Sequence, residues 1–335
     1  MKNRRKLLLL LFSVVLVLAL VACTPQNPVQ NGEEQQGQQE GQPEEQAVPI
    51  HIGIIMGPTG MGMAKLMEDA PAGYQFQLAS APDDIASSFG AGEYDIAAVP
   101  VNLAAALYQR TEGDTVVIAL NTLGVLYILE DGDTVQSLAD LAGKTLYATG
   151  QGSTPEYILN YVLAQNGLED TVTVEYKTEN SELATLLAAG EIDLAMLPEP
   201  NVTATMLKKA DLRVALDLTA EWDKVSDAEL VQGCLIASRQ FVEENPEALE
   251  AFLTQYAASV NYANENPEEA GQLIEKHGIM ASAAAAAKAI PNCNLVTVVG
   301  ADMKASMQAM LDVLYNANPK SVGGALPGDD FYYEK

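Results

Sequence analysis

The stretches AGEYDIAAVP (91–100) and AGEIDLAMLP (189–198) decide the fold of this 335-residue chain. Six of the ten positions are identical, and the others exchange small or apolar residues. Each copy is typical of a helix that ends at a glycine, Gly92 or Gly190, followed by a short apolar strand that a proline stops. Because the two copies are about a hundred residues apart, the repeat predicts two structural units with the same fold.

The segments around the two copies also follow the same order. A strand, a glycine-rich loop and a helix are predicted both in VPIHIGIIMGPTGMGMAKLME (48–68) and in GKTLYATGQGSTPEYILNYVLAQ (143–165). Short apolar runs that alternate with helices indicate an α/β fold, in which each lobe is a mainly parallel sheet flanked by helices. We therefore expect two lobes of this kind.

The lobes are not expected to be consecutive in the chain. The strand and long helices predicted after residue 229 have no counterpart in the first copy, so we expect them to return to the first lobe. This assigns 49–131 to lobe I, 132–228 to lobe II, and 229–335 to the return and the C-terminal helices and tail. Two crossings, near 129–137 and 222–230, would then form a hinge.

The first 48 residues are predicted to be a leader and a tether. Positive charges at Lys2, Arg4, Arg5 and Lys6 precede an apolar run, which is typical of a signal peptide over residues 1–22. A retained membrane helix is the alternative, because the run is close to the minimum length of a transmembrane span. The Gln-, Glu-, Gly- and Pro-rich segment 23–48 is predicted to be a disordered tether.

Charge and cysteine content narrow the possible functions. The formal net charge of −27 argues against a nucleic-acid partner, because a strongly acidic surface repels phosphate. Cys234 is predicted in a buried strand and Cys293 in a turn; an exported protein permits a disulfide between them, but separate thiols are the preferred interpretation. His51 and His277 are far apart in sequence, so no metal site or cofactor is predicted.

Several phrases of the sequence resemble a known family. SLADLAGKTLYATGQGSTPEYILNYVLAQNGL (137–168), LLAAGEIDLAMLPEPNVT (186–203) and SRQFVEENPEALEAFL (238–253) are similar to the solute-binding lipoproteins of ABC importers. More narrowly, they resemble the sulfonate-binding and NMT1/THI5-like group, which has the type II periplasmic-binding-protein fold. The C-terminal end departs from the family's general pattern.

The resemblance implies a lipid-anchored, extracytoplasmic receptor. Leu20-Val21-Ala22-Cys23 resembles the bacterial lipobox, which implies cleavage before Cys23, lipidation of its sulfur and further fatty acyl chains such as palmitate. The implied partners are a small-molecule solute, the membrane, and an ABC permease with its ATPase. We expect a monomer.

Four loops are predicted to bind the solute, because ligands of open α/β sheets lie beyond the carboxyl ends of the strands. Two are glycine-rich and open helices, whose free N–H groups favour an anion or a carbonyl oxygen, although a tight turn with ordinary capping explains them equally well. Gln232, with Gly233, and Thr122 are expected to line the hinge, and Tyr127 and Tyr157 to stack on a flat ligand or to lie in the core. The candidate residues are Thr59, Gly60, Met61, Asn102, Thr122, Gln151, Ser153, Thr154, Glu199, Asn201 and Gln232.

Glu199 is the most discriminating of these residues. A carboxylate there favours a cation or a hydrogen-bond donor, and none of the 18 Lys and Arg residues lies in the four loops. We therefore favour a heterocyclic vitamin precursor such as a thiamine pyrimidine over a sulfonate or nitrate. Alternatively, Glu199 only caps the local backbone.

A binding protein is favoured over two other classes. A secreted enzyme would use a Cys234–His277 pair, which the apolar surroundings of the cysteine disfavour. A ligand-sensing surface lipoprotein without a transporter is the second alternative. We expect no catalytic residue, and a mechanism in which the solute stabilises closure of the lobes.

Overall fold

The structure, a computed structural model, describes residues 49–334. The signal peptide, the tether and the lipidation of Cys23, which the sequence predicts, lie outside this part of the chain. Within it, no helix combines the length and the apolar character that crossing a membrane requires.

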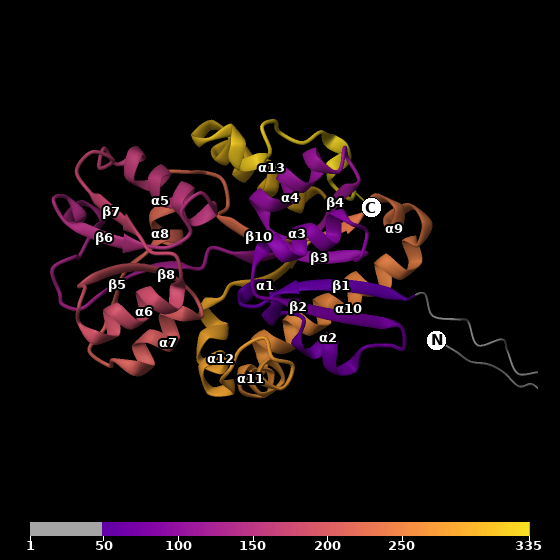
Figure 1. Ribbon diagram of the computed structural model, residues 1–335, viewed down its shortest axis with the longest axis horizontal. Helices are drawn as coiled ribbons and strands as arrows, with labels where there is room; N and C mark the ends of the chain where they lie inside the picture. The colour runs from indigo at the N-terminus through magenta and orange to yellow at the C-terminus, as the bar shows by residue number, and fades with distance from the viewer. Residues whose placement is uncertain (1–48, 335) are drawn as a thin grey trace, which may run out of the picture. The chain divides into compact units, whose positions relative to one another are not determined.

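Two β-sheets form the framework (Figure 1). The strands of the first sheet are β1 (Ile50–Ile55), β2 (Tyr74–Ala79), β3 (Ile96–Pro100), β4 (Thr115–Leu123), β10 (Val231–Ser238) and β11 (Leu295–Val298). Those of the second sheet are β5 (Leu126–Glu130), β6 (Thr145–Ala148), β7 (Thr173–Tyr176), β8 (Leu194–Pro198) and β9 (Arg213–Asp217).

Helices flank both sheets, as the alternating sequence pattern predicts. Those that precede β10 in the chain are α1 (Pro58–Met61), α2 (Ala64–Asp69), α3 (Pro82–Gly90), α4 (Val101–Arg110), α5 (Thr154–Gln165), α6 (Asn180–Ala189), α7 (Asn201–Lys208) and α8 (Leu218–Trp222). The later ones are α9 (Arg239–Glu244), α10 (Pro246–Glu265), α11 (Pro267–Lys276), α12 (Ala283–Ala289) and α13 (Gly300–Ala317). Short 3-10 helices are η1 (Leu138–Leu141), η2 (Ile290–Asn292), η3 (Pro319–Val322) and η4 (Asp329–Phe331).

The internal repeat is visible in the order of the strands. The first sheet contains the order β2-β1-β3-β10-β4, and the second has the matching order β7-β6-β8-β5-β9. The repeated decamer supplies β3 and β8, which occupy the same position in the two sheets. Gly92 and Gly190 both have the left-handed backbone that was predicted, with φ of +76° and +71°.

Each sheet has a parallel core but is mixed, because one strand arrives from the other lobe. The pairs of β1 with β2 and β3 are parallel, as are those of β6 with β7 and β8. In contrast, β10 is antiparallel to both of its neighbours, and so is β5. A strand that enters a sheet at the end where its parallel strands finish must run opposite to them.

The first crossing lies earlier in the chain than the sequence suggested. Because β5 already belongs to the second sheet, the crossing consists of Gly124 and Val125 and not of residues near 129–137. The second crossing, between the end of α8 and the start of β10, covers residues 223–230, close to the predicted place. The other lobe boundaries stay predictions.

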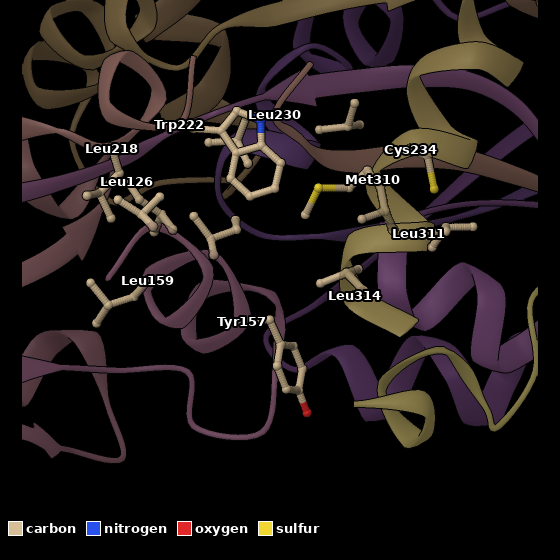
Figure 2. Close-up of a cluster of buried hydrophobic side chains, with 14 of the residues drawn as sticks. Leu126, Tyr157, Leu159, Leu218, Trp222, Leu230, Cys234, Met310, Leu311 and Leu314 are labelled. Atoms are coloured by element: carbon tan, nitrogen blue, oxygen red, sulfur yellow. The ribbon is translucent and has the colours of Figure 1, made fainter. Parts of the chain in front are cut away.

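One apolar cluster contains residues of both sheets (Figure 2). Trp222 of α8 lies in it with Leu126 of β5, while Cys234 of β10 and Met310 of α13 come from the other side. Trp222 is fully buried, and its indole N–H donates to the carbonyl of Ala228 at 2.5 Å. The crossing segments are therefore packed, not free.

Candidate functional site

Four helices begin almost directly after the strands that the repeat supplies. α4 follows β3 without a gap, and α7 follows β8 after two residues. α1 and α5 begin shortly after β1 and β6. Because these strands run parallel within each sheet, the loops lie at the carboxyl edge of the sheet, where ligands of α/β folds bind.

A direct hydrogen bond joins α4, which follows β3 of the first sheet, to α5, which follows β6 of the second sheet. The hydroxyl of Thr154, at the start of α5, donates to the Oδ1 of Asn102 in α4 at 2.8 Å. Thr154 is buried, so water does not compete freely for this bond. Ser153 occupies the N-cap position of α5, but its hydroxyl donates to the carbonyl of Gly150 at 2.6 Å and does not cap the helix.

Glu199 is buried between β8 and α7. Its carboxylate accepts from the backbone N–H of Thr203 at 3.1 Å and from the Thr203 hydroxyl at 2.8 Å. Burial raises the pKa of Glu199, and the bonds from Thr203 and the Asn292 amide offset this only in part. The residue therefore does cap the first turn of α7, as one interpretation of the sequence held, while remaining a buried carboxylate at the edge of the sheet.

Asn292 approaches Glu199 from outside the second sheet. Its Nδ2 lies 3.4 Å from the Oε1 of Glu199, and its carbonyl accepts from the Tyr127 hydroxyl at 3.2 Å. Burial, chiefly, and the charge of Asp217 raise the pKa of Tyr127. The sequence signal for Asn292 was only its place in the turn-like stretch IPNCNL, so it was missed.

Polar groups at the hinge come from both crossings. The Oε1 of Gln232 accepts from the backbone N–H of Val125 at 2.7 Å. Thr122 and its neighbour Asn121, which the sequence analysis did not select, are fully buried on β4. The Thr122 hydroxyl and the Asn121 Oδ1 have no hydrogen-bond partner among the described residues. Such buried groups are rare and mark this end of β4 as polar.

Gly233 allows three segments to meet at the hinge. A Cβ at this position would lie 2.4 Å from the Asn121 Oδ1 and 2.6 Å from the Thr59 Cγ2. Asn121 in turn donates from Nδ2 to the carbonyl of Thr59 at 3.3 Å. Thr59 of α1 is thus held against the end of β4 and the start of β10.

Three further candidates differ in how far they are exposed. Met61 is fully buried in the apolar core, where the Cys293 thiol lies 3.8 Å from its sulfur, so in this arrangement it has no surface for a solute. Gly60 is buried as well, and a Cβ there would lie 2.6 Å from the carbonyl oxygen of Ile55. Asn201 is half-buried at the start of α7.

Gln151 and Tyr157 lie on the α13 side of the loop. Gln151 is exposed and lines a hollow of about 840 Å³ between α5 and α13. The Tyr157 ring belongs to the apolar cluster and lies at its margin, with the hydroxyl pointing away from the other labelled side chains (Figure 2). This hydroxyl accepts from the Asn318 Nδ2 at 3.2 Å. Tyr157 is therefore a core residue here.

Cys234 and His277, the pair that the enzyme alternative would use, have separate surroundings. Cys234 is buried in β10, where burial raises the pKa of its thiol, and His277 contacts Glu68 through Nε2 at 3.1 Å. Cys234 and Cys293 are not disulfide-bonded. Within residues 49–334, no group of three or more His, Cys, Asp and Glu residues is placed to hold a metal ion.

Comparison with known proteins agrees with this geometry. The sequence profile of the family described as NMT1/THI5 like matches residues 84–270. An ABC transporter structure from Parabacteroides distasonis has 25% identity and a TM-score of 0.75, and the alignment covers 86% of this chain and 99% of that chain. A search of curated protein sequences finds no significant match.

Two further structures share the fold at lower identity. The periplasmic aliphatic sulphonate binding protein SsuA from Escherichia coli has 19% identity and a TM-score of 0.67, over 84% of this chain and 97% of that chain. The periplasmic nitrate-binding protein NrtA from Synechocystis PCC 6803 has 15% identity and a TM-score of 0.52, over 70% and 67%.

Two sheets with matching strand order, two crossings and a polar edge between them define a solute-binding protein with the type II periplasmic-binding-protein fold. The chain belongs to the NMT1/THI5-like family. It is accordingly the solute-binding component of an ABC importer, and a binder rather than an enzyme.

Proposed function

We propose that this protein binds a small organic solute that carries hydrogen-bond donors, such as an amino-heterocyclic vitamin precursor of the thiamine-pyrimidine kind. The observation that carries the proposal is the buried carboxylate of Glu199, which follows β8 at the carboxyl edge of the second sheet, while the acceptors of Asn102 and Asn121 lie at the carboxyl edge of the first. None of the residues gathered at this edge is Lys or Arg. Acceptors without a balancing cation favour a donor-bearing or positively charged solute over an anion.

Binding would act by population shift. A solute that contacts loops of both lobes binds the closed arrangement more tightly than an open one, and closure follows from that difference. The closed form then delivers the solute to an ABC permease driven by its ATPase. Ligand-binding residues proposed for this step are Thr59, Asn102, Thr122, Ser153, Thr154, Glu199, Asn201 and Gln232.

A sulfonate or nitrate is the second candidate solute. SsuA and NrtA, which share the fold, are named for binding these anions. α4, α5 and α7 also begin at the proposed edge, and helix N-termini attract anions. The buried Glu199 carboxylate argues against this candidate.

A thermal-shift screen of the full chain tests the proposal. The panel holds matched compounds, 4-aminopyrimidine with 4-methylpyrimidine and ethanolamine with ethanesulfonate, together with thiamine-pyrimidine precursors and nitrate. A solute at 100 times its dissociation constant adds about 2.7 kcal/mol of stability. We expect the amino compounds to raise the melting temperature, and Glu199→Gln to reduce that shift.

Two outcomes would contradict the proposal in different ways. Stabilisation by ethanesulfonate or nitrate alone would leave a solute-binding protein but overturn the assigned solute. A response to the amino compounds that Glu199→Gln leaves unchanged would overturn the role of this carboxylate.

Membrane attachment through Cys23 is part of the proposal. Residues 1–22 would be removed, and 23–48 would link the lipidated cysteine to the lobes of a monomer. Cys23→Ser is expected to release the protein from the membrane fraction, as immunoblotting of fractionated cells would measure. A protein that stays in the membrane would contradict the lipid anchor.

A further inference from the structure

The turn Asn292-Cys293-Asn294 touches the hinge and both sheets. It begins with the last residue of η2 and leads directly into β11. This turn lies outside residues 84–270, which the family profile matches. What it does is therefore a question about this chain and not about the family's shared part.

Asn294 anchors the turn to the first crossing. Its carbonyl accepts from the backbone N–H of Leu123 at 3.1 Å, and its Nδ2 donates to the carbonyl of Gly124. Its φ is +44°, a left-handed conformation that asparagine tolerates better than most residues. The turn is thus bound to the segment that any movement between the lobes has to bend.

Asn292 reaches from this anchor to the second sheet. Its two contacts there are Tyr127 on β5 and Glu199 after β8. α12, which leads into the turn, packs against α7, whose first turn Glu199 caps. One residue near the hinge therefore contacts a carboxylate of the proposed solute site from outside its lobe.

The other ionisable groups near this contact are Tyr127 and Cys293, two lysines on the packed helices, and Asp217 at the end of β9, whose charge acts on Tyr127. Burial raises the pKa of the Tyr127 hydroxyl and of the Cys293 thiol, so both stay protonated. Lys208 of α7 and Lys288 of α12 are exposed. Glu199 is the carboxylate that the Asn292 amide contacts directly.

We propose that Asn292 is a positioning residue that couples the closed arrangement of the lobes to Glu199. Its amide donates to the carboxylate only when α12 lies against α7, so the contact favours closure before any solute binds. This inference rests on the proposed function for the role of Glu199 in the site, but its test needs no solute.

Two variants test the contact directly. Asn292→Asp replaces the donor by an oxygen that faces the Glu199 carboxylate, and two carboxylates at this distance repel unless they share a proton. Glu199→Gln combined with Asn292→Asp reverses donor and acceptor, and so allows a hydrogen bond between the two side chains again.

The distance between the lobes can be measured by double electron–electron resonance. Spin labels would be placed at exposed Ser87 of α3 and Ser181 of α6, each replaced by Cys in the full chain with Cys23→Ser. Cys234 and Cys293 are fully buried and would not take label. The parent is expected to give the same distance at about pH 5 and about pH 8, because a hydrogen bond from Asn292 is available at both.

The expected result has a pH signature that a merely structural residue would not produce. Asn292→Asp should lengthen the distance at about pH 8 and restore it at about pH 5, and the double variant should match the parent at both. An unchanged distance in Asn292→Asp, or a lengthened one that the double variant does not restore, overturns the inference. If Asn292→Asp does not fold at pH 8, recovery of folding in the double variant decides the question.

The two proposals fail separately. A chain that no compound stabilises, but that shows this distance pattern, contradicts the proposed solute and keeps the role of Asn292. A chain that binds an amino-heterocycle but does not show this distance pattern keeps the proposed solute and contradicts the role of Asn292.

Discussion

The backbone N–H of Val125 donates to the side-chain Oε1 of Gln232 at 2.7 Å, and this bond joins the two segments through which the chain passes between its sheets. Val125 immediately precedes β5, and Gln232 lies at the start of β10. These strands hold matching positions in the two sheets. The bond therefore lies where the two halves of the repeat meet.

Removal of this acceptor should destabilise the hinge. In Gln232→Leu the buried N–H of Val125 has no partner, which is expected to lower the free energy of unfolding by about 1–3 kcal/mol. Gln232→Glu keeps an oxygen in place and serves as the matched control. Urea unfolding followed by circular dichroism measures both, and equal stability of Gln232→Leu and the parent would contradict the role given to this bond.

The bond between Thr154 and Asn102 should appear as a coupling energy. Thr154→Val keeps the shape of the side chain and removes the donor, and Asn102→Ala removes the acceptor. We expect the double variant to be less destabilised than the two single variants together, by about 0.5–1.5 kcal/mol. Strict additivity in urea unfolding would show that the two side chains do not interact in solution.

Glu130 should stabilise the fold in a pH-dependent way. Burial by itself would raise the pKa of this carboxyl, but bonds from Thr134, Val135 and Arg213 hold it below the ordinary value of 4.5. An acid with a lowered pKa contributes stability above its unfolded pKa and loses it as the pH falls through the folded pKa. Glu130→Gln is therefore expected to cost about 1–3 kcal/mol at neutral pH and much less at about pH 3.

Urea unfolding at the two pH values measures this difference. Asp69→Asn, which breaks the exposed pair of Lys65 and Asp69, is the control and should cost under about 1 kcal/mol. A loss for Glu130→Gln that is equally large at both pH values would show that charge is not responsible.

Trp222 should be the most costly core residue to truncate near the second crossing. Its ring packs 4.7 Å from that of Tyr161, centroid to centroid, and its N–H is bonded. Trp222→Ala should lower the free energy of unfolding by about 3–5 kcal/mol, and Trp222→Phe by clearly less. Leu207→Ala, at an exposed position, should change it by under about 0.5 kcal/mol. If Trp222→Ala and Leu207→Ala lowered the free energy of unfolding equally, the second crossing would not be packed as described.

The sequence predicted the parts of the structure that local patterns control. The repeated decamer, with its glycine cap, apolar strand and stopping proline, marks β3 and β8, and the matching strand orders of the two sheets follow from it. The loops that follow the parallel strands could be located from the sequence, because parallel strands all end at the carboxyl edge of their sheet.

Only the tertiary structure decided which strands pair and which side chains from distant segments come into contact. Whether β5 pairs in the first or the second sheet depends on partners that are far away in sequence, and so the first crossing was misplaced. Asn292 contacts Glu199 across 93 residues, and no periodicity of hydrophobic residues records such a contact. Met61 was selected from a glycine-rich loop, yet the core removes it from the surface. Local composition specifies strands, helices and turns, whereas long-range packing decides which polar side chains meet.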